Sequence, residues 1–151
     1  MKPQYIIIHC SDSEWGCSRE INKWHLERGF SGIGYNFVLL NGKPESGGRK
    51  ITSLMGCIEC GREVGAEGAH CLGYNKNSIG ICLVGKGQES FCTEQFDSLK
   101  MLVSELCTMH GIPAENVLGH NETESGKAEG KTCPNFPVEA IRVYLKGRVK
   151  L

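Results

Sequence analysis

The sequence predicts a single α/β domain in which helices flank a mixed central β-sheet. Short apolar runs typical of strands alternate with amphipathic helical segments along the whole chain. The 151 residues are the size of one domain and contain no internal repeat, linker or low-complexity tract. Hydrophobic residues make up 40% and charged residues 23%, which is ordinary for a globular protein. We therefore expect one domain over residues 1–151.

The first two elements are the clearest in the N-terminal part. Residues 5–8 form a β-branched run that predicts a strand buried on both faces. A helix is expected over residues 19–28, because Ser18 can cap its start and Gly29 can end it.

The middle of the chain predicts further strands. Residues 34–40 predict a second strand that ends at Asn41-Gly42, a strong hairpin signal. The partner strand is expected near residues 50–54. Residues 56–77 lack periodicity and are predicted to be loop, whereas residues 78–84 predict another strand.

The C-terminal part holds the strongest helical pattern. A helix is predicted over residues 93–110, and Gly111 is expected to end it. Its apolar residues repeat at helical spacing: Phe96, Leu99, Leu102, Val103 and Leu106. A short strand at 117–118, a polar loop over 122–130 and a last helix over 137–146 complete the prediction.

Charge and hydropathy exclude several classes of partner. Lys plus Arg and Asp plus Glu each number 17, so no basic field predicts nucleic-acid binding. No apolar run approaches the length of a membrane span. The run at residues 5–8 is too short for a signal-peptide core, so we expect cytoplasmic synthesis without a signal peptide. The nine cysteines would then be reduced and available to metals.

Three potential metal ligands lie at the edges of predicted elements. His9 closes the first strand, His120 follows the strand at 117–118, and Cys133 lies in a polar segment before the last helix. Three protein ligands leave a fourth position for water, which is the arrangement of catalytic zinc. Each residue alone is more often structural, so the pattern leaves both interpretations open.

A second cysteine pattern offers a rival metal site. Cys57 and Cys60 form a C-x-x-C pair, and His70-Cys71 follows in the same predicted loop. These residues could form a structural zinc site, a redox pair or a set of incidental thiols.

Several short blocks occur together in an order shared with one known family. They are 7–11 (IIHCS), 24–25 (WH), 28–30 (RGF), 32–37 (GIGYNF), 68–70 (GAH), 73–75 (GYN), 77–80 (NSIG), 119–120 (GH) and 131–136 (KTCPNF). From about residue 5 to 145 the chain resembles the zinc N-acetylmuramoyl-L-alanine amidases of the phage lysozyme and peptidoglycan recognition protein type.

The resemblance implies a peptidoglycan amidase-like fold and a zinc site. It implies that His9, His120 and Cys133 hold Zn2+ and that Tyr35 and Lys131 act as catalytic residues beside the metal. Zinc polarises a carbonyl and acidifies water, which suits amide hydrolysis. The Lys131 ammonium could stabilise an oxyanion, and the Tyr35 phenol could orient water or bond the intermediate.

The resemblance also places other polar residues around the cleft. It implies that His70, Asn75 and Asn77 bind substrate, although these residues could instead only brace their loop. His25 lies on the apolar face of the first predicted helix, so core packing is the better explanation. We expect neither His25 nor His110 to be a metal ligand.

Two segments depart from the family pattern. The stretch between His120 and Cys133 is long and rich in acidic residues, and the segment around 57–60 is also long. We expect Asp12, Glu14 and the acids of residues 122–129 to be solvated loop charges. They would then not be the paired carboxylates of a glycosidase.

The leading function is therefore hydrolysis of the amide between N-acetylmuramic acid and L-alanine in peptidoglycan. The alternative is a peptidoglycan-binding module that does not cleave, but such relatives typically lack the cysteine ligand, and Cys133 is present. A regulatory protein partner is a third possibility that no surface feature marks. We expect a monomer of phage or prophage origin that acts on the cell wall after release or export.

Overall fold

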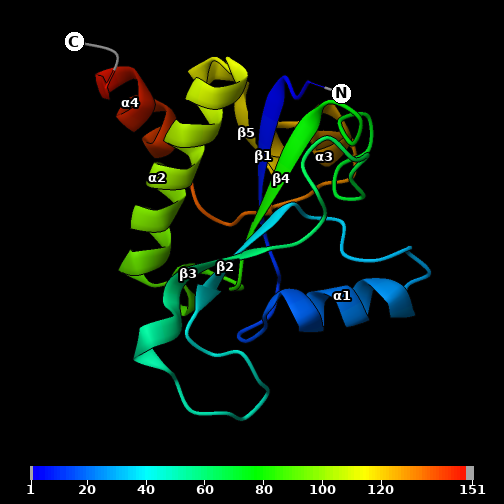
Figure 1. The fold of residues 1–151 in the computed structure, drawn as a ribbon, viewed down its shortest axis with the longest axis vertical. Coiled ribbons are helices and arrows are strands. Elements are labelled where there is room, and N and C mark those ends of the chain that lie inside the picture. Colours follow the sequence, from blue (N-terminus) through cyan, green and yellow to red (C-terminus); the bar gives the residue numbers. More distant parts are fainter. Residues whose placement is uncertain (1, 149–151) are drawn as a thin grey trace.

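The computed structural model describes residues 2–148, and five strands form one mixed sheet at its centre (Figure 1). The strands are β1 (Tyr5–Cys10), β2 (Phe37–Asn41), β3 (Met55–Cys60), β4 (Ser78–Leu83) and β5 (Val117–Gly119). Their order across the sheet is β3-β2-β4-β1-β5. Strand β3 is antiparallel to β2, and all other neighbours are parallel. The predicted mixed sheet is confirmed.

Helices cover both faces of this sheet. They are α1 (Ser18–Glu27), α2 (Thr93–His110), α3 (Glu124–Ala128) and α4 (Glu139–Arg148). In Figure 1, α2 and α4 lie together on one side of the sheet and α1 lies on the other. Four short 3-10 turns are η1 (Thr52–Leu54), η2 (Gln88–Ser90), η3 (Ala114–Asn116) and η4 (His120–Glu122). Within residues 2–148, no helix combines the length and apolar character needed to cross a membrane.

The alternation of side chains along β1 separates the core from the cleft. Ile6 and Ile8 are fully buried in the larger core, which includes residues of α2 and α4. His9 points to the opposite sheet face, because successive strand residues alternate in direction. On that second face, Ile21 of α1 packs with Val38 and Cys82 in a smaller core. The predicted strand with both faces buried is confirmed, and His9 lies where it ends.

Parallel pairing brings several strand ends to one edge of the sheet. The C-terminal ends of β1, β2, β4 and β5 lie together, because these strands run in the same direction. In open α/β sheets, ligands bind at this edge. The fold therefore places the residues that follow β1 and β5 next to each other.

Helix α2 forms over the residues that its apolar pattern predicts. Leu99 and Val103 are fully buried against the sheet. Gly111 ends the helix in the left-handed region with φ 68°, a conformation that costs glycine little. Gln95 is also buried, and its side-chain amide donates to the carbonyls of Leu39 and Val84. Through Gln95, α2 therefore forms hydrogen bonds with β2 and with the residue that follows β4.

The partner of β2 differs from the prediction. The pairing strand is β3, which lies in the segment predicted as loop except for its first residue, Met55. Residues 52–54 of the expected partner form a 3-10 turn instead. Gly56 has a positive φ of 73°, and the register shifts between Leu39 and Asn41. The positive φ of Gly56 and the register shift interrupt the alternation of apolar and polar residues by which an edge strand is recognised in a sequence. The Asn41-Gly42 turn leads into a longer connection.

The segment predicted as a polar loop over residues 122–130 contains a helix. The hydroxyl of Thr123 caps α3 by accepting from the N–H of Gly126. A helix this short has no apolar period to reveal it in the sequence. Tyr35 precedes β2 rather than lying in it, and α4 begins two residues later than the expected helix.

Candidate metal centre

His9, His120 and Cys133 converge at the edge where β1 and β5 end. One ligand atom from each residue lies within 4.8 Å of the other two, and within residues 2–148 no other group of three His, Cys, Asp or Glu residues meets this condition. The Nδ1 of His9 lies 3.9 Å from the sulfur of Cys133. Tetrahedral zinc with nitrogen and sulfur ligands holds such atoms about 3.5 Å apart. The donor set therefore fits a metal of the zinc type with a fourth position left for water.

The two histidines come from neighbouring parallel strands. His9 is 1% exposed at the end of β1, and His120 opens η4 directly after β5. Since β1 and β5 pair in parallel and Gly119 pairs with Ile8, the next residue of each strand, His120 and His9, follows on the same side. The ring centroids of His9 and His120 are 4.7 Å apart.

The loop that carries Cys133 is attached to the end of β1. The N–H of Cys10 donates to the sulfur of Cys133 at 3.1 Å, and the N–H of Asn121 donates to the Cys133 carbonyl at 2.9 Å. Asn135 donates from its amide to the Lys86 carbonyl at 2.6 Å and to the Cys10 sulfur at 3.5 Å. The long segment before Cys133 thus folds through α3 and returns to the other two candidate ligands.

Burial keeps the imidazoles of this region neutral at neutral pH. Desolvation, with a smaller effect of His70, holds the pKa of His9 well below its usual value. Desolvation and then Lys131 lower the pKa of His120. Burial lowers the pKa of His70 to about 3. A neutral imidazole has a free nitrogen lone pair, which is the form that binds metals.

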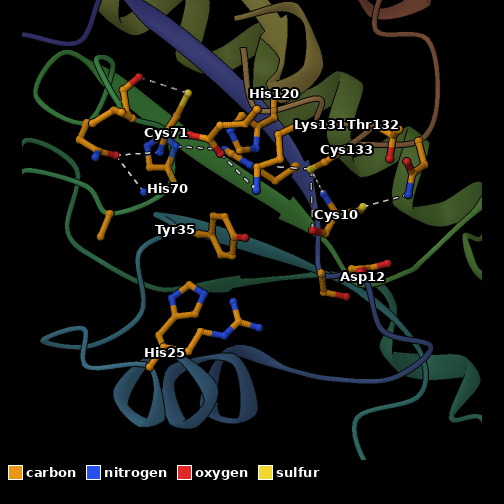
Figure 2. A pocket seen from close by; sticks show the side chains of 18 of the residues that line it. Cys10, Asp12, His25, Tyr35, His70, Cys71, His120, Lys131, Thr132 and Cys133 are labelled. Atoms are coloured by element: carbon orange, nitrogen blue, oxygen red, sulfur yellow. Dashed lines mark hydrogen bonds and ion pairs between the residues drawn. The ribbon is translucent and has the colours of Figure 1, made fainter. Parts of the chain in front are cut away.

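Tyr35 and Lys131 lie beside the cluster in the same cleft of about 640 Å³. In Figure 2 the Tyr35 ring lies between the ligand cluster and His25 of α1, and its centroid is 5.0 Å from that of His9. Burial raises the pKa of Tyr35 well above its ordinary value, so the phenol stays protonated. The Lys131 side chain is 45% exposed, and its ammonium lies 3.3 Å from the carboxylate of Glu129.

The three residues expected to bind substrate are placed differently from one another. His70 and Asn75 line the cleft, and the side-chain carbonyl of Asn75 accepts from the N–H groups of His70 and Cys71. Asn77 lies outside the cleft, in a separate depression that Tyr74 also lines. Substrate contact by these residues stays a prediction.

Several cleft residues were not identified from the sequence. They are Cys10, Asp12, Arg28, Phe30, Leu72 and Asn135, among others. Cys10 directly follows the candidate ligand His9, and this position was a usable signal. Arg28 and Phe30 reach the cleft from just beyond the end of α1. Both belong to the block at residues 28–30 that carries the family resemblance, and this block was a signal that could have identified them.

The rival site around Cys57 and Cys60 is not formed. Both residues lie on β3, where a spacing of three directs side chains to opposite faces. Cys57 donates its thiol to the Ser53 carbonyl at 3.3 Å. Cys71 lies instead against Thr123, with a sulfur–oxygen distance of 3.5 Å. Within residues 2–148, none of Cys57, Cys60, His70 and Cys71 belongs to a group that could hold a metal. The hypothesis of a structural zinc site here is therefore wrong.

His25 has the packing role expected of it. It is buried, and its Nδ1 accepts from the N–H of Gly34 at 2.9 Å. That bond uses the lone pair a metal would need. His110 lies in the last turn of α2, and neither histidine belongs to the candidate metal cluster found in residues 2–148.

Glu122 is not the solvated charge expected from the sequence. Its two carboxylate oxygens accept from the guanidinium of Arg142, each at 2.8 Å, and one of them also accepts from the N–H of Gly119 at 2.8 Å. Arg142 donates further to the Val117 carbonyl at 2.8 Å. The pair therefore connects α4 to the end of β5, where His120 begins. Asp12 and Glu14 are exposed, as expected.

We predict that Glu122→Gln weakens the fold in a pH-dependent way. Arg142 lowers the pKa of Glu122, so the stabilisation is present above about pH 4.3, the ordinary glutamate pKa, and is lost as the pH falls through the lower folded value. At pH 7 the variant should lose about 1 to 2 kcal/mol in free energy of unfolding, because the Glu122 side chain is 33% exposed and partly screened.

Urea denaturation of both proteins between pH 3 and pH 7 measures this effect. The difference between them should shrink at the acidic end. Glu139→Gln is the matched control, because Glu139 contacts the same guanidinium but is 61% exposed. A deficit that is independent of pH, or equal in both variants, would contradict the prediction.

Comparison with known proteins places this chain among amidases. Residues 1–136 match the Amidase_2 family, described as N-acetylmuramoyl-L-alanine amidase. The endolysin of Escherichia phage T7 is 33% identical over 144 residues, which cover 89% of this chain and 82% of the relative. The solved amidase LysC from Clostridium intestinale URNW has a TM-score of 0.75 and 25% identity, covering 97% of this chain and 87% of its own. Drosophila PGRP-LB has a TM-score of 0.67 and 26% identity, covering 99% and 82%.

Proposed function

The chain belongs to the N-acetylmuramoyl-L-alanine amidase family and is an amidase of the endolysin type, and we propose that it works through zinc held by His9, His120 and Cys133. Its substrate would be the amide between the lactyl group of N-acetylmuramic acid and L-alanine in peptidoglycan. The observation that carries the proposal is the convergence of two neutral imidazoles and one thiol at the wall of a large cleft. Two imidazoles and a thiolate favour zinc over magnesium or calcium, which prefer oxygen ligands.

When bound at these residues, zinc supplies a Lewis acid for the scissile carbonyl and lowers the pKa of water. The protein must provide the remaining interactions. Because its phenol stays protonated, Tyr35 can donate a hydrogen bond to the oxygen that becomes negative during attack. It can equally orient the attacking water.

Lys131 brings a positive charge to the cleft, which Arg28 also lines. Its ammonium is paired with Glu129, and both side chains are about half exposed. An exposed ion pair of this kind is weak, so the ammonium can leave Glu129 for a developing oxyanion at little cost. The same charge can hold a carboxylate of the stem peptide while the substrate binds.

A binding module without catalysis is the alternative. Such a module requires only a cleft, whereas this chain also keeps a thiol, a protonated phenol and a lysine in the same cleft. These groups are the ones that amide hydrolysis uses, so we favour the enzyme.

Analysis of cleaved peptidoglycan tests the proposal. Digestion of purified cell walls should release new N-terminal alanine amines and leave the glycan strands long. The reason is that hydrolysis at this amide frees an amine, whereas a glycosidase frees reducing sugar ends. Amines should be counted by dinitrophenylation and reducing ends by borohydride reduction.

The metal-loaded protein, a chelated sample and a reloaded sample form one matched series. Amine release should stop on chelation and return with zinc. Reducing ends without new alanine amines would show that the protein cleaves a glycosidic bond and not the proposed amide. Amine release that survives complete metal removal would exclude the zinc mechanism.

A further inference from the structure

A line of hydrogen bonds runs from a main-chain carbonyl to His9. The Ser78 hydroxyl donates to the Tyr74 carbonyl at 2.7 Å. The same hydroxyl oxygen lies 3.4 Å from the Nε2 of His70, and the Nδ1 of His70 lies 3.0 Å from the Nε2 of His9. Figure 2 shows His70 beside the ligand cluster, on the side away from Cys133.

The Tyr74 carbonyl determines which group donates in each hydrogen bond of this series. A carbonyl oxygen can only accept a hydrogen bond, so the Ser78 hydroxyl donates its one proton to the Tyr74 carbonyl. The Ser78 oxygen can then only accept a hydrogen bond from His70. His70 then carries its proton on Nε2, which leaves Nδ1 with a lone pair. His9 must donate to that lone pair from its own Nε2.

The result at His9 is a free lone pair on Nδ1, the nitrogen 3.9 Å from the Cys133 sulfur. In the other tautomer, a proton would occupy Nδ1 and would have to leave before a metal could bind. We propose that His70, itself held by Ser78, is a positioning residue that selects the Nε2–H tautomer of His9 and keeps its Nδ1 open to the metal. This inference rests on the proposed metal site, and it gives His70 a role besides substrate binding.

The His70 ring is held in place from several sides. A Cβ atom at Gly80 or at Gly68 would lie 2.7 Å from the Cδ2 of His70, so the ring occupies space that only glycine leaves free. Gly80 belongs to β4 and pairs with Ile7 of β1, on the sheet face that also carries His9. Asn75 accepts from the backbone N–H of His70 at 2.8 Å. The ring therefore rests against the sheet beside its partner.

Outer partners of metal-binding histidines commonly act in this way. The second nitrogen of the ring donates to a carboxylate, carbonyl or water, and loss of that partner costs about 10- to 100-fold in metal affinity. Here the partner is another imidazole, which can accept only when its own proton lies on the far nitrogen. Ser78 supplies the acceptor for that proton.

Nitrogen NMR of the full-length chain, labelled with ¹⁵N-histidine, tests the tautomers directly. Long-range proton–nitrogen spectra should show His9 and His70 both protonated on Nε2, in the zinc-loaded protein and after chelation. The metal-free spectrum needs neither zinc nor activity. A His70 ring protonated on Nδ1, in either sample, would overturn the inference.

Zinc affinity by chelator competition tests the consequence. His70→Ala should raise the Kd for zinc about 10- to 100-fold. His70→Asn should recover most of that loss, because its amide oxygen can accept where Nδ1 stood. Ser78→Ala should fall between His70→Ala and the wild type, and a mixture of His70 tautomers should appear in its spectrum.

Ser98→Ala is the matched control. Ser98 also donates its hydroxyl to a main-chain carbonyl, that of Gly56, but it lies on α2 across the sheet. Its Kd for zinc should equal that of the wild type. An unchanged Kd in a folded His70→Ala protein would overturn the positioning role, whereas a wild-type protein that binds no zinc would instead overturn the proposed metal site.

Discussion

Cys133→Ser should lose the metal and with it all measurable amidase activity. A serine hydroxyl is a weak ligand that stays protonated at neutral pH, whereas a thiolate is a charged, soft ligand for zinc. Loss of an outer partner alone costs about 10- to 100-fold in affinity, so removal of a direct ligand should cost more than about 100-fold. Metal content after dialysis and alanine amine release from cell walls measure the two effects.

The substitution should leave the fold largely intact. Cys133 lies in a loop, and the same loop is also attached through backbone bonds and through Asn135. Cys57→Ser is the matched control, because Cys57 is a partly buried thiol on β3 that is remote from the cluster. Full zinc occupancy together with full activity in Cys133→Ser would remove this residue from the site.

Tyr35→Phe and Lys131→Ala should retain one zinc per chain and still lose most of their turnover. Both groups are proposed to act on charge that develops during the reaction, and the loss of one such donor commonly costs about 10² to 10³ in kcat. Neither residue belongs to the candidate metal cluster found in residues 2–148. The effect should therefore appear in kcat, while the zinc content stays at the wild-type value.

Two conservative controls match these substitutions. Tyr5→Phe removes a phenol hydroxyl outside the cleft, where the Tyr5 ring packs against Tyr74. Lys127→Ala removes an exposed lysine of α3 that does not line the cleft. Both should remain within about twofold of wild-type kcat, since surface changes of this kind are usually near neutral. Loss of zinc from Tyr35→Phe or Lys131→Ala would contradict the role given to that residue.

Local patterns were enough to predict the elements that bury a regular face. The apolar repeat of α2 and the β-branched run of β1 can each be recognised within one short segment of the sequence. The candidate ligands were also predicted from the sequence: His9 closes a predicted strand, His120 follows one, and Cys133 lies in the polar segment before the last helix. Their positions at element edges suggested one three-ligand site, and the family resemblance implied the same set.

The features that could not be predicted from the sequence depend on contacts between distant segments or on irregular local geometry. Strand β3 pairs at the sheet edge around a glycine irregularity, and α3 is a single capped turn, so neither has a period to detect. The ion pair of Glu122 with Arg142 joins residues on different elements. From the sequence, Glu122 is one acid among several in a polar stretch.

The sequence by itself determined which chemical groups this protein has and which elements carry them. Only the tertiary structure decided which nitrogen of His9 faces Cys133 and which faces His70. That choice depends on Ser78 and on the room left by Gly80, both on β4. Hydrogen-bond direction and steric fit are properties of neighbours in space, and the parallel pairing of β1 with β4 makes these residues neighbours.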